Sequence, residues 1–239
     1  ELIMAKLNFH PADNRGQTDL GWLKSKHSFS FGSYTDINKM HFGVLRVLND
    51  DWLTMGMGFS PHSHENMEII SIPLAGELAH NDSMGNSSVV TKGEIQVMSA
   101  GTGIQHSEFN NSRIKSVEFL QIWILPNKMN IDPRYSQQTI DFEKAKNTFL
   151  QILSPNENDS GVWIQQEAWF HWSVFDLDFE REYLFKNKNN GLYIFVLSGR
   201  IQVYGKSIGA RDGFAVMGVT QIHIKAEDQA EFLLIEIPV

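Results

Sequence analysis

The sequence predicts an all-β protein with two β-barrels in one chain. Short strand-like segments separated by turn residues recur at intervals of about 8–12 residues, which is typical of sandwiches and barrels. The second half repeats the order of strands and turns found in the first half. The 239 residues include 16 Phe and 6 Trp, and 42% hydrophobic residues, which is enough to fill β cores.

The first half contains most of the regular strand patterns. Its predicted strands are 27–34, 42–48, 55–59, 67–73, 77–81, 88–91, 94–98 and 118–125. Turn-forming residues separate them, among them Asn49-Asp50-Asp51 and Gly76. Pro126 ends the last strand, residues 127–138 have the polar composition of a linker, and residues 141–146 form a short helical turn.

The second half repeats this organisation. Its predicted strands are 162–165, 168–177, 192–197, 200–204, 213–217, 221–225 and 231–237. Leu74-Ala75-Gly76-Glu77-Leu78 resembles Leu197-Ser198-Gly199-Arg200-Ile201, at an offset of roughly 110–125 residues that is too long for a solenoid repeat. A duplicated barrel explains the pattern, so we predict domains at residues 1–130 and 131–239.

Two pairs of metal-binding side chains distinguish the first domain. His62 and His64 are two residues apart, as are His106 and Glu108, and on a strand this spacing places both members of a pair on one face. If the two strands pair, three imidazoles and one carboxylate converge on a point, which suits a first-row divalent ion. The second domain lacks this double motif, so it is predicted to be metal-free and structural. The remaining histidines are isolated and are treated as ordinary core or surface residues: His10, His27, His41, His80, His171 and His223.

The ligand set narrows the chemistry but leaves the metal open. The chain has no cysteine, so a site must use nitrogen and oxygen ligands. Glu68 is a second candidate carboxylate, but on a regular strand it would lie about 13 Å beyond His64. We therefore rank Glu108 as the ligand and Glu68 as an outer carboxylate that orients an imidazole, with an exposed strand-end charge as the alternative. Gly101 and Gly103 predict a tight turn before His106.

Three segments resemble the motifs of the pirin family, within the cupin superfamily. They are Pro61-His62-Ser63-His64, Gly76-Glu77-Leu78-Ala79-His80-Asn81-Asp82-Ser83-Met84-Gly85-Asn86 and Met98-Ser99-Ala100-Gly101-Thr102-Gly103-Ile104-Gln105-His106-Ser107-Glu108. The resemblance implies two cupin-type, jelly-roll-like barrels, that is, a bicupin. Many pirins have Arg-Gly-Phe-Glu after the second histidine, whereas this chain has Glu65-Asn66-Met67-Glu68, which changes the lip of the pocket.

The resemblance implies two alternative functions and a metal in both. The first is a dioxygenase, similar to quercetin 2,3-dioxygenase, that opens a flavonol or related phenol with O2, with Glu108 or Glu68 taking a proton. The second is a redox-responsive regulator, similar to transcription cofactors, that acts through a protein partner. The preferred ion is Fe(II), and Mn, Ni, Co, Cu or Zn would also suit the ligands. A degenerate barrel without chemistry is disfavoured because all four ligand positions are filled.

Charge and hydropathy limit the partners. The formal net charge of −8 argues against direct binding to nucleic acid, which requires a basic surface. No apolar run approaches the ~18 residues that span a bilayer, so no membrane association is predicted. The lack of cysteine fits a cytoplasmic location. The expected partner is a small phenolic substrate, with a protein partner in the regulatory alternative.

Overall fold

The computed structural model describes residues 5–239, and contacts divide them into two compact units. The N-terminal barrel comprises Gly16–Ile140 and Val162–Gln166, and the C-terminal barrel comprises the described residues up to Arg15, Asp141–Gly161 and Glu167–Val239. The predicted domains, divided between residues 130 and 131, differ from these units. The residues up to Arg15 group with the C-terminal barrel, and Val162–Gln166 group with the N-terminal barrel. The predicted all-β fold with two barrels is confirmed.

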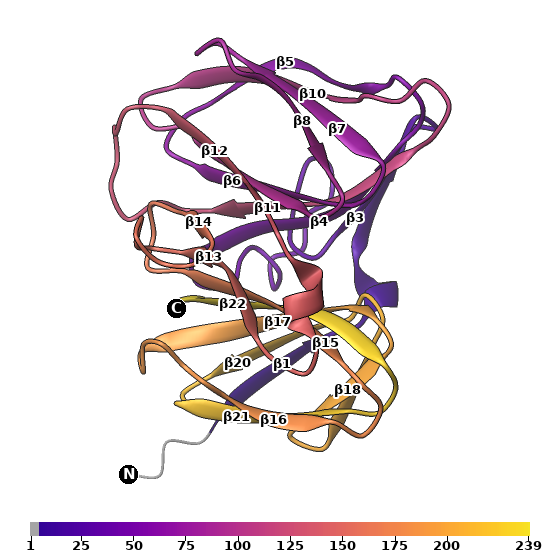
Figure 1. Ribbon diagram of the computed structural model, residues 1–239, viewed down its shortest axis with the longest axis vertical. Coiled ribbons are helices and arrows are strands. Elements are labelled where there is room, and N and C mark those ends of the chain that lie inside the picture. Colours follow the sequence, from indigo (N-terminus) through magenta and orange to yellow (C-terminus); the bar gives the residue numbers. More distant parts are fainter. Residues whose placement is uncertain (1–4) are drawn as a thin grey trace. The chain divides into compact units, whose positions relative to one another are not determined.

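The N-terminal barrel consists of a seven-stranded and a four-stranded antiparallel sheet (Figure 1). The larger sheet has the order β12–β9–β6–β11–β4–β3–β2, and the smaller has the order β5–β10–β7–β8. The strands of these sheets are β2 (Gly16–Asp19), β3 (Leu23–His27), β4 (Leu45–Leu53), β5 (Gly58–His64), β6 (Glu68–Ala75), β7 (Glu77–Asp82), β8 (Ser87–Thr91), β9 (Glu94–Ser99), β10 (Ile104–Asn110), β11 (Val117–Ile124) and β12 (Arg134–Thr139). The unit also contains the short strand β14 (Val162–Trp163), which belongs to neither sheet.

The C-terminal barrel also has two antiparallel sheets. One contains β1, β20, β17, β22, β15 and β13 in that order, and the other contains β16, β21, β18 and β19. The elements are β1 (Lys6–His10), η1 (Ala12–Asn14), η2 (Phe142–Ala145), β13 (Leu150–Ser154), β15 (Trp169–Phe175), β16 (Glu180–Leu184), β17 (Asn190–Ser198), β18 (Arg200–Val203), β19 (Lys206–Gly209), β20 (Gly213–Met217), β21 (Gln221–Ala226) and β22 (Ala230–Pro238).

Alternating apolar side chains build the core of each barrel. In the C-terminal barrel, Leu192, Ile194 and Val196 of β17 are spaced two apart and join one buried cluster. In the N-terminal barrel, Phe119 of β11 and Leu78 of β7 meet in a cluster that joins the two sheets. These apolar clusters bury the large aromatic residues that dominate core stability.

Most predicted strands overlap strands of the structure, but the strand predicted at 55–59 shares only Gly58 and Phe59 with β5. The helical turn at 141–146 is confirmed as η2, but the strand predicted at 27–34 is wrong, because only Leu23–His27 is extended there. The turn predicted at Asn49-Asp50-Asp51 is also wrong, because β4 continues through it to Leu53. Those residues are paired on both sides, with β3 and β11, and backbone pairing outweighs their turn propensity. The predicted linker at 127–138 contains most of β12.

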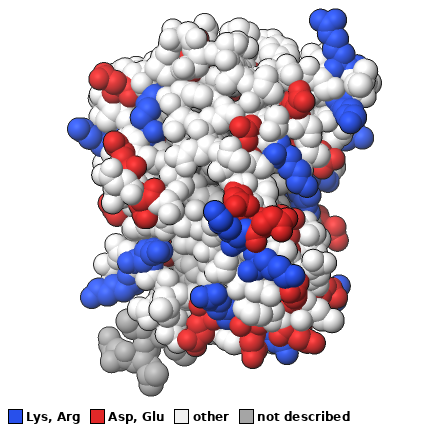
Figure 2. All heavy atoms as spheres, in the orientation of Figure 1, with Lys and Arg blue, Asp and Glu red and all other residues white. Residues whose placement is uncertain are grey.

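Charged side chains do not gather by sign on the face of the molecule in view. Figure 2 shows Lys and Arg interspersed with Asp and Glu, with no basic stripe on that face. Among residues 5–239, no helix has the length and apolar character needed to cross a bilayer.

The turn before β10 depends on Gly101. Its φ is +51°, and a Cβ added there would lie 2.1 Å from the carbonyl oxygen of Ile131. That oxygen also accepts a hydrogen bond of 2.9 Å from the backbone N–H of Thr102, so it is held in place. The predicted tight turn is confirmed, and it positions the strand that carries His106.

We expect Gly101→Ala to lower the free energy of unfolding of the N-terminal barrel by about 3 kcal/mol or more, since left-handed backbone alone costs about 1–2 kcal/mol in an L-residue. Gly21→Ala is the matched control: its φ is +80°, but nothing lies within 4 Å of the added Cβ. Urea unfolding followed by tryptophan fluorescence measures both variants. Equal losses in the two would show that the contact with Ile131 has no energetic weight.

Candidate metal centre

Three histidines converge between strands β5 and β10. The antiparallel register pairs His106 with His62 and Ile104 with His64. The ring centroids of His62 and His64 are 4.9 Å apart, and those of His62 and His106 are 4.5 Å apart. One ligand atom from each of the three histidines lies within 4.8 Å of the others. The i, i+2 spacing therefore brings the imidazoles together as the sequence indicated.

The facing nitrogens have the separation expected of two ligands on one ion. His62 Nε2 and His106 Nε2 are 3.0 Å apart. Two nitrogens each about 2.1 Å from an ion, at a right angle to one another, would be separated by about 3.0 Å. His62 Nδ1 donates a 2.8 Å hydrogen bond to the carbonyl oxygen of Ser60, which leaves the Nε2 lone pair facing the cluster.

His64 and His106 are neutral at physiological pH. Burial lowers the pKa of His64 to about 4, and the neighbouring His62 makes a smaller contribution in the same direction. Burial lowers the pKa of His106 to about 3, and the nearby histidines add to the effect. The Nδ1 atom of His106 is buried without a hydrogen-bond partner among the described residues. Neutral, clustered nitrogens with unpaired polar atoms fit a divalent transition metal.

Glu108 is buried beside the histidines and held by the opposite sheet. Ser71 Oγ donates to Glu108 Oε1 at 3.1 Å, and Gln121 Nε2 donates to Oε2 at 2.6 Å. Burial raises the pKa of Glu108, while His80 and these donors oppose the rise. Glu108 is not part of the group of three described histidines whose ligand atoms lie within 4.8 Å, so its role as fourth ligand stays a prediction.

A row of polar side chains crosses the larger sheet beneath Glu108. Direct cross-strand pairs share a face of the sheet, and each member of the row pairs with the next. From β3 to β9 the row consists of His27, Asn49, Gln121, Ser71 and Gln96. All five are buried. The sequence alone did not link these residues, because only the register of strand pairing places them in one row.

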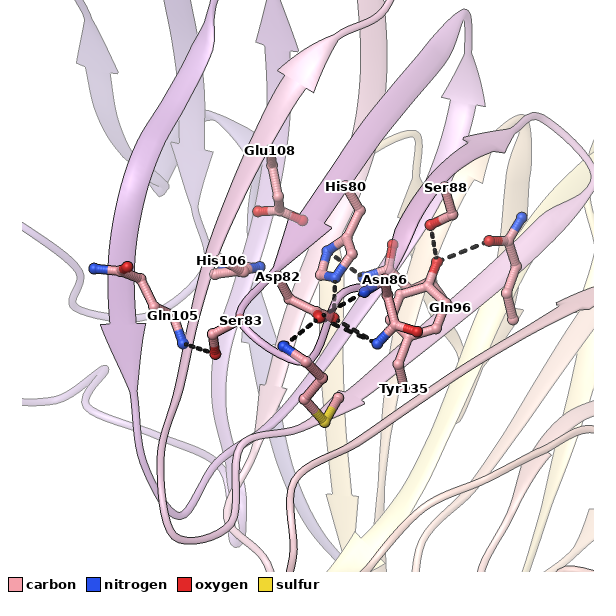
Figure 3. Close-up of polar contacts among 12 residues, drawn as sticks. His80, Asp82, Ser83, Asn86, Ser88, Gln96, Gln105, His106, Glu108 and Tyr135 are labelled. Atoms are coloured by element: carbon pink, nitrogen blue, oxygen red, sulfur yellow. Dashed lines mark hydrogen bonds and ion pairs between the residues drawn. The ribbon is translucent and has the colours of Figure 1, made fainter.

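His80 and Asp82 form a buried pair on β7, next to His106 (Figure 3). His80 Nε2 lies 2.8 Å from Asp82 Oδ2, and Gln96 Nε2 lies 3.3 Å from His80 Nδ1. The rings of His80 and His106 have centroids 5.4 Å apart. Burial alone would raise the pKa of Asp82, but hydrogen bonds from His80 and Asn86 hold it below its usual value. The sequence interpretation of His80 as an isolated histidine missed this pair, although His80 and Asp82 show the same i, i+2 spacing.

Glu68 lies elsewhere in the barrel. It is 1% exposed, which excludes the exposed strand-end charge. Its Oε2 accepts hydrogen bonds from Ser99 Oγ at 2.8 Å and from the backbone N–H of Gln165 at 3.1 Å, and it lies 4.0 Å from Arg134 Nη2. Its described partners include no imidazole, and it is not among the described residues that line the cavity below. We therefore correct the prediction that Glu68 orients a metal ligand or takes a proton: its carboxylate joins strands.

A cavity of about 360 Å³ opens beside the histidines. This volume is at the lower end of the range for small-molecule sites. Its walls combine apolar and aromatic side chains with a polar set, and the residues are Thr18, Leu23, Ser25, His27, Phe31, Gly32, Ser33, Asp51, Phe59, His62, His64, Glu108, Gln121 and Trp123. The arrangement can hold an aromatic molecule against a metal centre.

Comparisons with known proteins cover both barrels. The family model described as Pirin matches residues 8–124, and the model described as Quercetinase C-terminal cupin domain matches residues 151–237. The chain is 38% identical over 228 residues to "Quercetin 2,3-dioxygenase" of Escherichia coli (strain K12), covering 95% of this chain and 96% of that protein. It is 34% identical over 227 residues to "Pirin-like protein" of Caulobacter vibrioides, covering 95% and 97%. The crystal structure of the bacterial pirin YhhW from Escherichia coli in complex with nickel(II) superposes with a TM-score of 0.92 at 36% identity, covering 98% of this chain and 99% of that one.

Proposed function

The chain belongs to the pirin family, and from that premise we propose that it is a metal-dependent dioxygenase that opens a flavonol or a related phenol with O2. The observation that carries the proposal is the convergence of His62, His64 and His106 beside a cavity with largely aromatic and apolar walls. The relative named as a quercetin 2,3-dioxygenase supports the same reaction class.

The proposed ligands are the three histidines and Glu108, with Fe(II) as the preferred ion. When bound, the metal supplies a Lewis acid and a template for a chelating oxygen of the substrate. His62 is held for this purpose by its bond to Ser60, which fixes the ring and its tautomer.

The protein's own residues position the substrate and accept its proton. Phe31, Phe59 and Trp123 line the cavity, where they pack against an aromatic ring and exclude water. Glu108 accepts the proton of the phenolic hydroxyl, because burial raises the affinity of its carboxylate for a proton. Ser71 and Gln121 keep that carboxylate facing the cavity.

The remaining expectations about partners stay predictions. No contact among residues 5–239 and no comparison favours the regulatory alternative over the enzymatic one. The cytoplasmic location rests on sequence composition.

Turnover of quercetin tests the proposal. Purified protein is loaded anaerobically with Fe(II), Ni(II), Mn(II), Co(II) or Cu(II), mixed with quercetin and exposed to air, and the loss of flavonol absorbance is followed. We expect turnover in at least one metal form, above the background of metal-free protein and of the free ions. Absence of turnover with all five ions would refute the proposal.

A further inference from the structure

Asp51 is a buried carboxyl in the middle of β4. It is 3% exposed and lines the cavity beside the histidines. No described Lys, Arg or His forms an ion pair with it. A buried carboxyl without a cation costs stability, so its position calls for a physical explanation.

The hydrogen bonds of Asp51 leave one of its oxygens available. Ser25, its direct cross-strand neighbour on β3, donates from Oγ to Asp51 Oδ1. Among the described residues, Ser25 is the only hydrogen-bond partner of this carboxyl, so Oδ2 has none. Burial raises the pKa of Asp51 to about 7. The hydrogen bond from Ser25 opposes this rise, and the charge of Glu108 adds to it. A hydrogen-bond donor at Oδ2 would therefore stabilise the carboxylate.

Trp123 provides a complementary polar atom on the same cavity. Its Nε1–H is buried and has no acceptor among residues 5–239. The indole stands edge-on to His64, with ring centroids 4.9 Å apart and planes inclined at 82°. The cavity thus presents an unmatched acceptor and an unmatched donor, and a hydroxyl group can satisfy either kind.

We propose that Asp51, held by Ser25, is a recognition site for a hydroxyl group of a polyhydroxylated aromatic substrate, additional to the oxygens that the metal would bind. The proposal rests on the proposed function, because it needs an aromatic ligand beside the histidines. A site built to hydrogen-bond a hydroxyl discriminates against analogues that lack it, since the buried polar group is then left unpaired.

Anaerobic binding to Ni(II)-loaded protein tests this subsite without turnover. The probes are quercetin and 3-hydroxyflavone, which share the chelating 3-hydroxyl and 4-carbonyl groups but differ in their other hydroxyls. Dissociation constants are taken from absorbance titrations. We expect wild type to bind quercetin at least about 10-fold more tightly than 3-hydroxyflavone, since a hydrogen bond to a charged group contributes about 1.5–3 kcal/mol.

Substitutions at Asp51 should remove this preference. In Asp51→Leu the ratio of the two dissociation constants is expected to fall below about 3, because the apolar side chain gives the extra hydroxyls no acceptor. Asp51→Asn, which keeps an acceptor oxygen, should give an intermediate ratio. Asp50→Asn is the matched control, because adjacent side chains on a strand point to opposite faces of the sheet.

The outcomes separate the subsite from the reaction. A lower ratio in Asp51→Leu with an unchanged ratio in Asp50→Asn supports the subsite. Binding of both flavonols with the wild-type ratio in Asp51→Leu overturns the subsite and leaves the proposed reaction intact. Absence of binding to loaded wild type overturns both. Bound nickel and the thermal midpoint check folding, and if Asp51→Leu does not fold, Asp51→Asn decides, since a wild-type ratio in that variant would overturn the subsite.

Discussion

Replacing His106 with alanine is expected to leave the purified protein without bound metal. His106 is the buried member of the cluster, and its Nε2 lies 3.0 Å from that of His62. We expect the affinity for Ni(II) or Fe(II) to fall by more than about 100-fold, because losing only an outer partner of a metal ligand costs about 10–100-fold. Elemental analysis and titration against a competing chelator measure the loss.

Two further variants make this result specific. His223→Ala is the control, since His223 is exposed on β21 and bonds Glu180 at 3.0 Å in the C-terminal barrel. Because alanine at the buried position 106 leaves a cavity, His62→Ala provides the same test at a half-buried position. Wild-type metal content in folded His106→Ala and His62→Ala would remove the histidine cluster as the metal site.

The second large effect is expected for Glu108→Gln, which should lower the rate of flavonol turnover by about 10²–10⁴-fold, the usual contribution of a general base. Glutamine nearly preserves the shape of the side chain, so the cavity and the three histidines stay in place. Steady-state kcat and KM, with metal content measured in parallel, give the result.

Glu68→Gln is the matched control for this substitution. Glu68 is also 1% exposed in the same barrel, but its carboxylate bonds Ser99 and Gln165 instead of lining the cavity. We expect its kcat to stay within a few-fold of wild type even if stability falls. Comparable loss of kcat in both variants, or retention of most activity in Glu108→Gln, would contradict the assignment of the proton acceptor.

Local pattern was a reliable guide wherever one short segment carries the information. The i, i+2 spacing of His62 and His64 was sufficient to place both rings on one face of a strand, because side-chain direction alternates along any strand. Positive φ at Gly101 and Gly103 confirmed the tight turn predicted before β10. The recurring strands and the echo between halves likewise predicted two barrels.

Pattern failed where polar residues enter the barrel. Asn49-Asp50-Asp51 has turn composition, yet it lies in the middle of β4, where Asn49 joins the polar row and Asp51 lines the cavity. Local propensity disagrees with the fold at this segment, as is common at functional sites. His27 was likewise treated as isolated, because its partner Asn49 lies on another strand, whereas the i, i+2 pair of His80 and Asp82 lies within β7 and was overlooked.

By itself, the sequence determined the all-β class, the repeated barrel and the three histidines that can share a metal, since each depends on alternation within one strand or on turn chemistry. Only the tertiary structure decided that Glu68 bonds Ser99 and Gln165 and that His80 and Asp51 lie beside the site. Strand register makes that difference, because it is set by the packing of whole sheets and brings together residues that lie far apart in the chain.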